Sequence, residues 1–110
     1  MRKETFFEFA KALFAIDSPT GYTHHAMDFL KTEAEKLGYK AWLNAKGNLL
    51  IEVDGEDSTY TKAVCAHVDT LGLMVRSIKG DGKLAFTVLG GPLLPTYDGE
   101  YCRVITREGK

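Results

Sequence analysis

The sequence predicts an α/β fold, on three observations of its apolar pattern. Apolar residues recur at helical spacing over roughly the first third of the chain. After Gly38 they recur at the spacing of strands, and from about Leu71 onward every predicted element is a strand. Helices that precede strands in this way favour a layered α/β arrangement. We therefore expect the start of a layered α/β domain over residues 1–70 and an incomplete β-rich domain over residues 71–110.

Two amphipathic helices are predicted before Gly38. The first covers about residues 3–16, and its apolar face consists of Phe6, Phe9, Ala10, Leu13 and Phe14. The second has an apolar stripe made of Ala26, Met27, Leu30, Ala34 and Leu37. A dense turn signal at residues 17–21 separates them, and Thr20 or Thr23 is expected to cap the second helix. Gly38 stands where a left-handed C-cap is expected.

The strands are predicted from short apolar runs bounded by turn residues. The expected ranges are 39–44, 48–53, 62–66, 71–78, 84–89 and 100–106. Residues 79–83 have the composition of a hairpin loop between two of them. The run at 62–66 consists of small apolar residues after Lys62, which indicates a strand buried on both faces and makes Cys65 a small core residue.

Charge and composition exclude several classes of function. The net charge is −1, from 14 basic and 15 acidic residues, so no basic field is available for nucleic acid. No apolar stretch reaches the roughly 18 residues that a membrane-spanning helix needs. Glu8 and Lys11 interrupt the apolar start, unlike a secretory signal, and Cys65 and Cys102 do not form a disulfide framework. We therefore expect a cytoplasmic protein with no nucleic-acid or membrane partner.

The most informative residues for chemistry are His67 and Asp69. Positions two apart in extended backbone face the same way, so both side chains are expected to point out of the carboxyl end of the sheet. A neutral imidazole binds zinc or cobalt, and a nearby carboxylate accepts its other N–H group. On these residues alone, the commoner explanation is a structural histidine at a strand end, hydrogen-bonded to a loop carboxylate.

Other residues with chemical side chains are assigned to structure. His24 and His25 are adjacent at a helix start, where neighbouring side chains diverge by about 100°, so they are expected at the surface and without a shared metal. The Gly80-Asp81-Gly82 loop has no strand–helix context and is a turn, not a phosphate-binding loop.

Four stretches of the chain resemble, in order, one family of enzymes. They are Ser18-Pro19-Thr20-Gly21-Tyr22, Gly47-Asn48-Leu49-Leu50, Ala66-His67-Val68-Asp69-Thr70-Leu71-Gly72-Leu73-Met74-Val75 and Leu89-Gly90-Gly91. The chain is similar over essentially its whole length to the amino-terminal portion of the tetrahedral-assembly (TET) aminopeptidases, also called glutamyl or deblocking aminopeptidases, which are dinuclear metallopeptidases. Many members have Ser at the position of Thr20 and Glu at that of Thr70.

The resemblance implies a function and roles for two residues. His67 matches a ligand to one of two divalent metal ions, zinc or cobalt, and Asp69 matches the catalytic-site carboxylate that orients this histidine. The activity implied is attack of metal-activated water on the first peptide bond of peptide substrates. The resemblance further implies a homo-oligomer built from dimers, up to a dodecamer, and makes residues 71–110 the start of a β-barrel-like dimerisation domain.

The remaining catalytic residues of this family match no position in the chain. Two metals about 3.5–4 Å apart need a bridging carboxylate and several further ligands. We therefore expect an amino-terminal fragment that is inactive alone. The alternative is a short, non-catalytic paralogue that acts as an interaction or assembly module. A glycan-cleaving enzyme ranks last, because no two carboxylates are placed for the roughly 5–10 Å spacing that glycoside hydrolysis needs.

Overall fold

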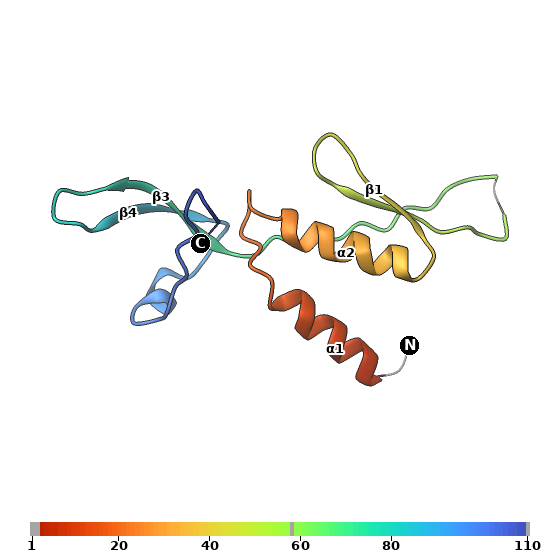
Figure 1. Cartoon of the computed structure of the whole chain (residues 1–110), viewed down its shortest axis with the longest axis horizontal. Coiled ribbons are helices and arrows are strands. Elements are labelled where there is room, and N and C mark those ends of the chain that lie inside the picture. The colour runs from red at the N-terminus through yellow and green to blue at the C-terminus, as the bar shows by residue number, and fades with distance from the viewer. Residues whose placement is uncertain (1–2, 58, 110) are drawn as a thin grey trace. The chain divides into compact units, whose positions relative to one another are not determined.

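A computed structural model describes residues 3–57 and 59–109 and shows an α/β chain (Figure 1). Its elements are α1 (Lys3–Phe14), α2 (His24–Lys36), β1 (Lys40–Leu43), β2 (Leu49–Glu52), β3 (Gly72–Ile78), β4 (Leu84–Leu89) and a 3-10 helix η1 (Leu94–Tyr97). The chain divides into two compact units, the second of which begins at Gly72. That division lies one residue after the predicted one, and the dimerisation role of the second unit remains a prediction.

Both predicted helices are present. In α1, Glu4 lies in the first turn and Lys11 in the last, where each charge opposes the helix dipole. A Schellman motif ends α2: Gly38 has a φ of 84°, its N–H donates to Glu35 O at 2.9 Å, and Tyr39 N–H donates to Ala34 O at 3.1 Å. Glycine adopts this left-handed conformation without a steric cost, so the predicted cap is confirmed.

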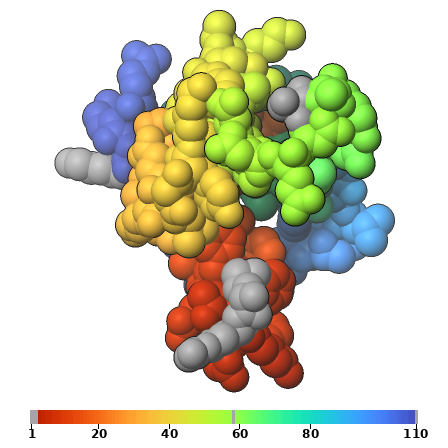
Figure 2. Space-filling view, turned by 90° about the vertical axis from the view of Figure 1, so that its right-hand side faces the viewer, coloured from red at the N-terminus to blue at the C-terminus, as the bar shows by residue number. Residues whose placement is uncertain are grey.

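The core of the N-terminal unit is small and centres on α2. This helix contacts both β1 and β2, and buries Ala26 and Ala34. Phe9 of α1 meets Phe29 of α2 with ring centroids 5.7 Å apart. Figure 2 shows α1, in red, standing out from the orange and yellow residues of α2. Because little covers α1, its aromatic Phe14 is 81% exposed.

Among the described residues, each unit has one antiparallel hairpin, made of strands that lie within the predicted ranges. In the first, β1 pairs with β2, and Trp42 lies opposite Leu50. Its turn is held by the side chain of Asn44, whose Oδ1 accepts from the N–H groups of Lys46 and Asn48 at 2.9 and 3.0 Å. In the second, β3 pairs with β4 around the predicted 79–83 loop, with an irregularity between Val75 and Ser77.

Two predicted strands are absent from the described residues. Residues 62–66 and 100–106 are irregular, and neither run is buried. Val64 is 98% exposed, and Cys65 is an exposed free cysteine, so the predicted buried strand and the core role of Cys65 are wrong. An apolar run becomes a strand only when a neighbouring strand satisfies its N–H and C=O groups. Within residues 3–57 and 59–109, no strand pairs with either run.

Candidate functional site

The loop between α1 and α2 is tied to the segment that follows residue 66. Pro19 forms an isolated parallel bridge with Thr70, and the N–H of Thr70 donates to Ser18 O at 2.8 Å. The loop itself closes in a turn, in which Tyr22 N–H donates to Pro19 O at 2.8 Å and Gly21 has a φ of 89°. These contacts bring Thr20 next to Asp69, far away in the sequence.

His67 and Asp69 are in direct contact. The ring Nδ1 of His67 lies 2.9 Å from Asp69 Oδ1 and 3.2 Å from Asp69 O. A carboxylate and a carbonyl only accept hydrogen bonds, so Nδ1–H is the donor, and in the neutral ring Nε2 keeps its lone pair. The side chain of His67 is 82% exposed, which leaves Nε2 open to an external ligand. Neither residue lies at the end of a regular strand, contrary to expectation.

Thr20 supplies the second contact to the carboxylate. Its Oγ1 donates to Asp69 Oδ2 at 2.7 Å, so each carboxylate oxygen accepts one hydrogen bond. The hydrogen bond from Thr20 and then that from His67 lower the pKa of Asp69, because both stabilise its ionised form. Asp69 is therefore an anion at neutral pH.

The sequence did not reveal this role of Thr20. Thr20 was predicted as one of two residues able to cap α2, but Thr23 occupies the N-cap position and makes no hydrogen bond there with its side chain. The turn residues beside Thr20 were visible in the sequence. Its pairing with Asp69 was not, because it depends on the bridge between Pro19 and Thr70.

His67 and Asp69 lie at the edge of a hollow of about 280 Å³. The hollow is lined by Leu13, Phe14, Ile16, Ser18, Ala26, His67, Val68, Asp69 and Thr70. Most of these are apolar, so the hollow offers an apolar floor beside one histidine and one carboxylate. Ser18 is 3% exposed, and its Oγ has no hydrogen-bond partner among the described residues, which leaves a buried hydroxyl beside the pair.

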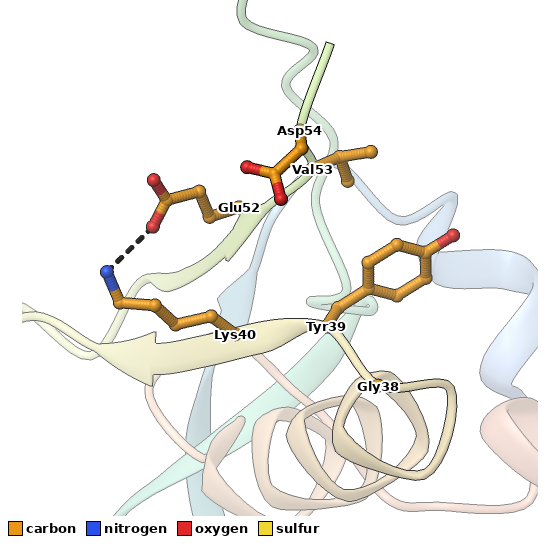
Figure 3. Close-up of a pocket in the computed structure, with 6 residues that line it drawn as sticks. All are labelled: Gly38, Tyr39, Lys40, Glu52, Val53 and Asp54. Atoms are coloured by element: carbon orange, nitrogen blue, oxygen red, sulfur yellow. Dashed lines mark hydrogen bonds and ion pairs between the residues drawn. The ribbon is translucent and has the colours of Figure 1, made fainter.

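A larger hollow of about 560 Å³ shares no lining residue with the first. Figure 3 shows its walls, which are Gly38, Tyr39, Lys40, Glu52, Val53 and Asp54. Lys40 Nζ pairs with Glu52 Oε2 at 2.8 Å across the β1–β2 hairpin. This is an exposed cross-strand ion pair, and the residues that line the hollow include no histidine, cysteine or serine. We therefore place the candidate site at the smaller hollow, where a charged and hydrogen-bonded pair meets an apolar floor.

The pair His24 and His25 lies at the surface, as predicted. Their ring centroids are 4.0 Å apart, closer than their divergence on a helix suggested. His25 Nε2 is within 3.3 Å of Tyr22 Oη, and the Tyr22 ring packs edge-on against His24 at 4.5 Å between centroids. The two rings therefore belong to a small aromatic cluster at the start of α2.

The donor atoms of the site fit one ligand of a metal ion and no more. Across residues 3–57 and 59–109, no group of three or more His, Cys, Asp and Glu side chains is placed to hold a metal. At the candidate site, Nε2 of His67 is the ring nitrogen left free for a ligand, because Nδ1 donates to Asp69. This matches the usual arrangement of a metal-binding histidine whose other nitrogen is held by a carboxylate.

Comparison with known proteins identifies the family. Residues 47–110 match the model of the M42 glutamyl aminopeptidase family. The chain belongs to this family. It is 37% identical over 103 residues to YhfE of Bacillus subtilis, to which aminopeptidase activity is ascribed, and 31% identical over 105 residues to the glutamyl aminopeptidase of Lactococcus lactis. It is also 32% identical over 102 residues to the lysyl aminopeptidase of Pyrococcus furiosus.

These alignments cover most of the chain but a minor part of each relative. They include 94%, 94% and 86% of the chain, and 30%, 30% and 28% of the three relatives. The chain thus spans less than a third of the length of these relatives. The matched region of the family includes both His67 and Asp69.

Proposed function

We propose that this chain is part of a metal-dependent aminopeptidase that removes amino-terminal residues from peptides. The observation that carries the proposal is the contact between His67 Nδ1 and Asp69 Oδ1 in a chain of the M42 family. The relatives named as glutamyl and lysyl aminopeptidases support an activity on peptide amino termini. Their names differ in the residue preferred, so the preferred residue is not part of the proposal.

His67 is proposed to bind one of two divalent metal ions, zinc or cobalt, through Nε2. Asp69 is proposed to hold the ring in the Nδ1–H form, in which Nε2 faces outward with its lone pair. A bound divalent metal supplies Lewis-acid activation of water and of the peptide carbonyl. The other ligands and the group that accepts the proton of water are proposed to come from other residues of the M42 protein, since the described residues hold no further ligand cluster.

The apolar residues beside His67 are proposed to form one wall of the site. Val68, Leu13 and Ile16 line the hollow together with His67 and Asp69. This part of the chain is proposed to orient a ligand beside an apolar surface.

The second unit and the cellular location are also part of the proposal. The unit from Gly72 is proposed to begin a β-rich dimerisation domain of a homo-oligomer built from dimers, and the protein is proposed to act in the cytoplasm. Its open hairpin, β3–β4, supports the first point, because strand edges can pair with further strands. In the part of the chain that the structure describes, no helix has the length and apolarity to cross a membrane.

The proposal is tested by His67→Ala in the protein at its full encoded length. Loss of a metal ligand should reduce the bound metal, measured by elemental analysis, and abolish hydrolysis of an aminoacyl chromogenic substrate. His24→Ala is the matched control, because His24 is an exposed histidine at the start of α2. Unchanged metal content and activity in His67→Ala would refute the ligand role.

A further inference from the structure

The Asp69 carboxylate is held from two sides, and only one of them is His67. A carboxyl group rotates easily about its last torsion, for which no sharp rotamers exist. With the hydrogen bond from His67 alone, only the imidazole would restrict the rotation of the Asp69 carboxylate. The hydroxyl of Thr20, at 2.7 Å from Oδ2, fixes the opposite oxygen. The orientation of the carboxylate is therefore determined by both partners.

Thr20 is itself held in place by the backbone. It lies between Pro19, which forms the bridge to Thr70, and Gly21, whose φ of 89° closes the turn. The hydrogen bond from Thr70 N–H to Ser18 O, at 2.8 Å, fixes the same loop on the other side of Pro19. Threonine also has a restricted χ1, because two heavy atoms branch from its Cβ. The hydroxyl thus approaches Asp69 from an ordered position.

We propose that Thr20 is a positioning residue, whose hydroxyl orients Asp69 so that Asp69 holds His67 in the Nδ1–H form with Nε2 directed to a divalent cation. The proposal rests on the proposed function and adds a third residue to the pair. Without the hydroxyl, the carboxylate turns more freely and His67 populates the Nε2–H form, in which Nε2 has no lone pair to offer. Thr20 touches neither a metal nor a substrate, and it acts through Asp69.

Both partners of this hydrogen bond are accessible to water. Thr20 is exposed, and the Asp69 side chain is 40% exposed, so water competes for both hydrogen bonds. The bridge and the turn hold the two groups close together through backbone hydrogen bonds, so the side-chain hydrogen bond needs little further ordering of the chain. Preorganisation of this kind removes the ordering cost that makes most exposed hydrogen bonds weak.

The test measures zinc affinity in the metal-free protein at full encoded length, by competition with a chromophoric chelator. Residues that hold a metal-binding histidine contribute about 10- to 100-fold in affinity. Thr20 is one hydrogen bond further from the metal than Asp69 is. Thr20→Val should therefore weaken zinc binding by about tenfold, the lower end of that range. Thr20→Ser keeps the hydroxyl and should retain the affinity of the unchanged protein. Thr20→Ala, which introduces no bulk, should behave as Thr20→Val does.

The matched control is Thr23→Val. Thr23 is three residues away at the N-cap of α2, and its hydroxyl makes no cap hydrogen bond, so the same chemical change should leave zinc affinity unchanged. A second measurement needs no metal: the ring ¹⁵N chemical shifts of His67 report which nitrogen carries the proton. They should move toward the Nε2–H form in Thr20→Val and stay unchanged in Thr20→Ser and Thr23→Val.

The outcomes separate this inference from the proposed function. If His67→Ala loses zinc while Thr20→Val binds it as the unchanged protein does, with unaltered ring shifts, the role of Thr20 is wrong and the ligand role of His67 stands. Equal losses in Thr20→Val and Thr20→Ser would also overturn the inference, because the hydroxyl would not matter. If His67→Ala binds zinc normally, the proposed function fails, and the ring shifts alone still decide whether Thr20 orders the pair.

Discussion

Thr20 Oγ1 and Asp69 Oδ2 are joined by a hydrogen bond of 2.7 Å, although 49 residues separate them in the sequence. Two short backbone features bring them together, the turn at Gly21 and the bridge from Pro19 to Thr70. The chemistry proposed for His67 therefore depends on a loop between helices that has no metal ligand of its own. Substitutions at these positions test different parts of this arrangement.

Removal of the negative charge at Asp69, without a change in side-chain shape, should weaken metal binding at the site. Asp69→Asn has nearly the same volume, but a neutral amide increases the basicity of His67 less than a carboxylate does. We expect metal affinity and peptidase activity to fall by about 10- to 100-fold. Asp81→Asn is the control: Asp81 also accepts a hydrogen bond through Oδ1, from the backbone N–H of Lys83 at 3.2 Å, but it lies in the β3–β4 loop. Equal affinities for Asp69→Asn and the unchanged protein would contradict the role of Asp69.

A side chain at Gly21 should destabilise the loop. Gly21 has a φ of 89°, and a Cβ there meets no atom within 4 Å, so the cost is purely that of the left-handed backbone. This cost is about 1–2 kcal/mol for an ordinary L-residue. Gly21→Ala should lower the free energy of unfolding by that amount, measured by urea denaturation of the protein at full encoded length.

Gly80→Ala is the matched control for Gly21→Ala. Gly80 also has open space around its Cβ position, but it does not have a positive φ. The control should leave stability unchanged or raise it slightly, because alanine restricts the unfolded chain. A similar loss of stability in both variants would show that the turn conformation at Gly21 is not the cause.

The ion pair of the β1–β2 hairpin should titrate in the alkaline range. Lys40 lies directly opposite Glu52, and the hydrogen bond and charge of Glu52 raise the pKa of Lys40 above its ordinary 10.5. The pair therefore stabilises the hairpin fully below that value and loses its effect as the pH rises through the raised pKa.

NMR titration of ¹³C-labelled lysine measures this pKa directly. Glu52→Gln should lower the pKa of Lys40, whereas Glu56→Gln, which removes a charge from the exposed loop after β2, should leave it unchanged. High salt should reduce the difference, because both side chains are exposed and their charges are screened. An unchanged pKa in Glu52→Gln would show that the pair does not persist in solution.

The 110 residues alone should hydrolyse no aminoacyl chromogenic substrate, with added Zn²⁺ or Co²⁺. One histidine with an open nitrogen is too few ligands for a two-metal centre, and the described residues hold no cluster of three. The assay should include His67→Ala. Turnover that is present in the chain and lost in the variant would overturn the expectation that the chain is inactive alone.

The local elements were predictable from the sequence, because their signals are local. The helical spacing of α1 and α2, Gly38 at the C-cap and the 79–83 loop each depend on residues within a few positions of one another. The predictions of strands at 62–66 and 100–106 were wrong because strand formation depends on residues that are not local. Their apolar pattern describes what they need to bury, but a strand also needs a partner, which their own sequence does not specify.

The candidate site was predictable in part for the same reason. His67 and Asp69 lie two positions apart, and extended backbone between them is sufficient for contact. Thr20 lies in a different part of the chain, and its own neighbours, Pro19 and Gly21, indicate only a turn. That the turn meets Asp69 follows from tertiary structure alone.

The bridge from Pro19 to Thr70 also has a consequence for the order of folding. Helices and hairpins form early because they close short loops, whereas this bridge closes a long one and must wait for them. We therefore expect the contacts of His67 and Thr20 to complete the N-terminal unit instead of nucleating it. An ion that binds only the closed loop stabilises that last step by mass action. Occupancy of His67 would then report that the unit has finished folding.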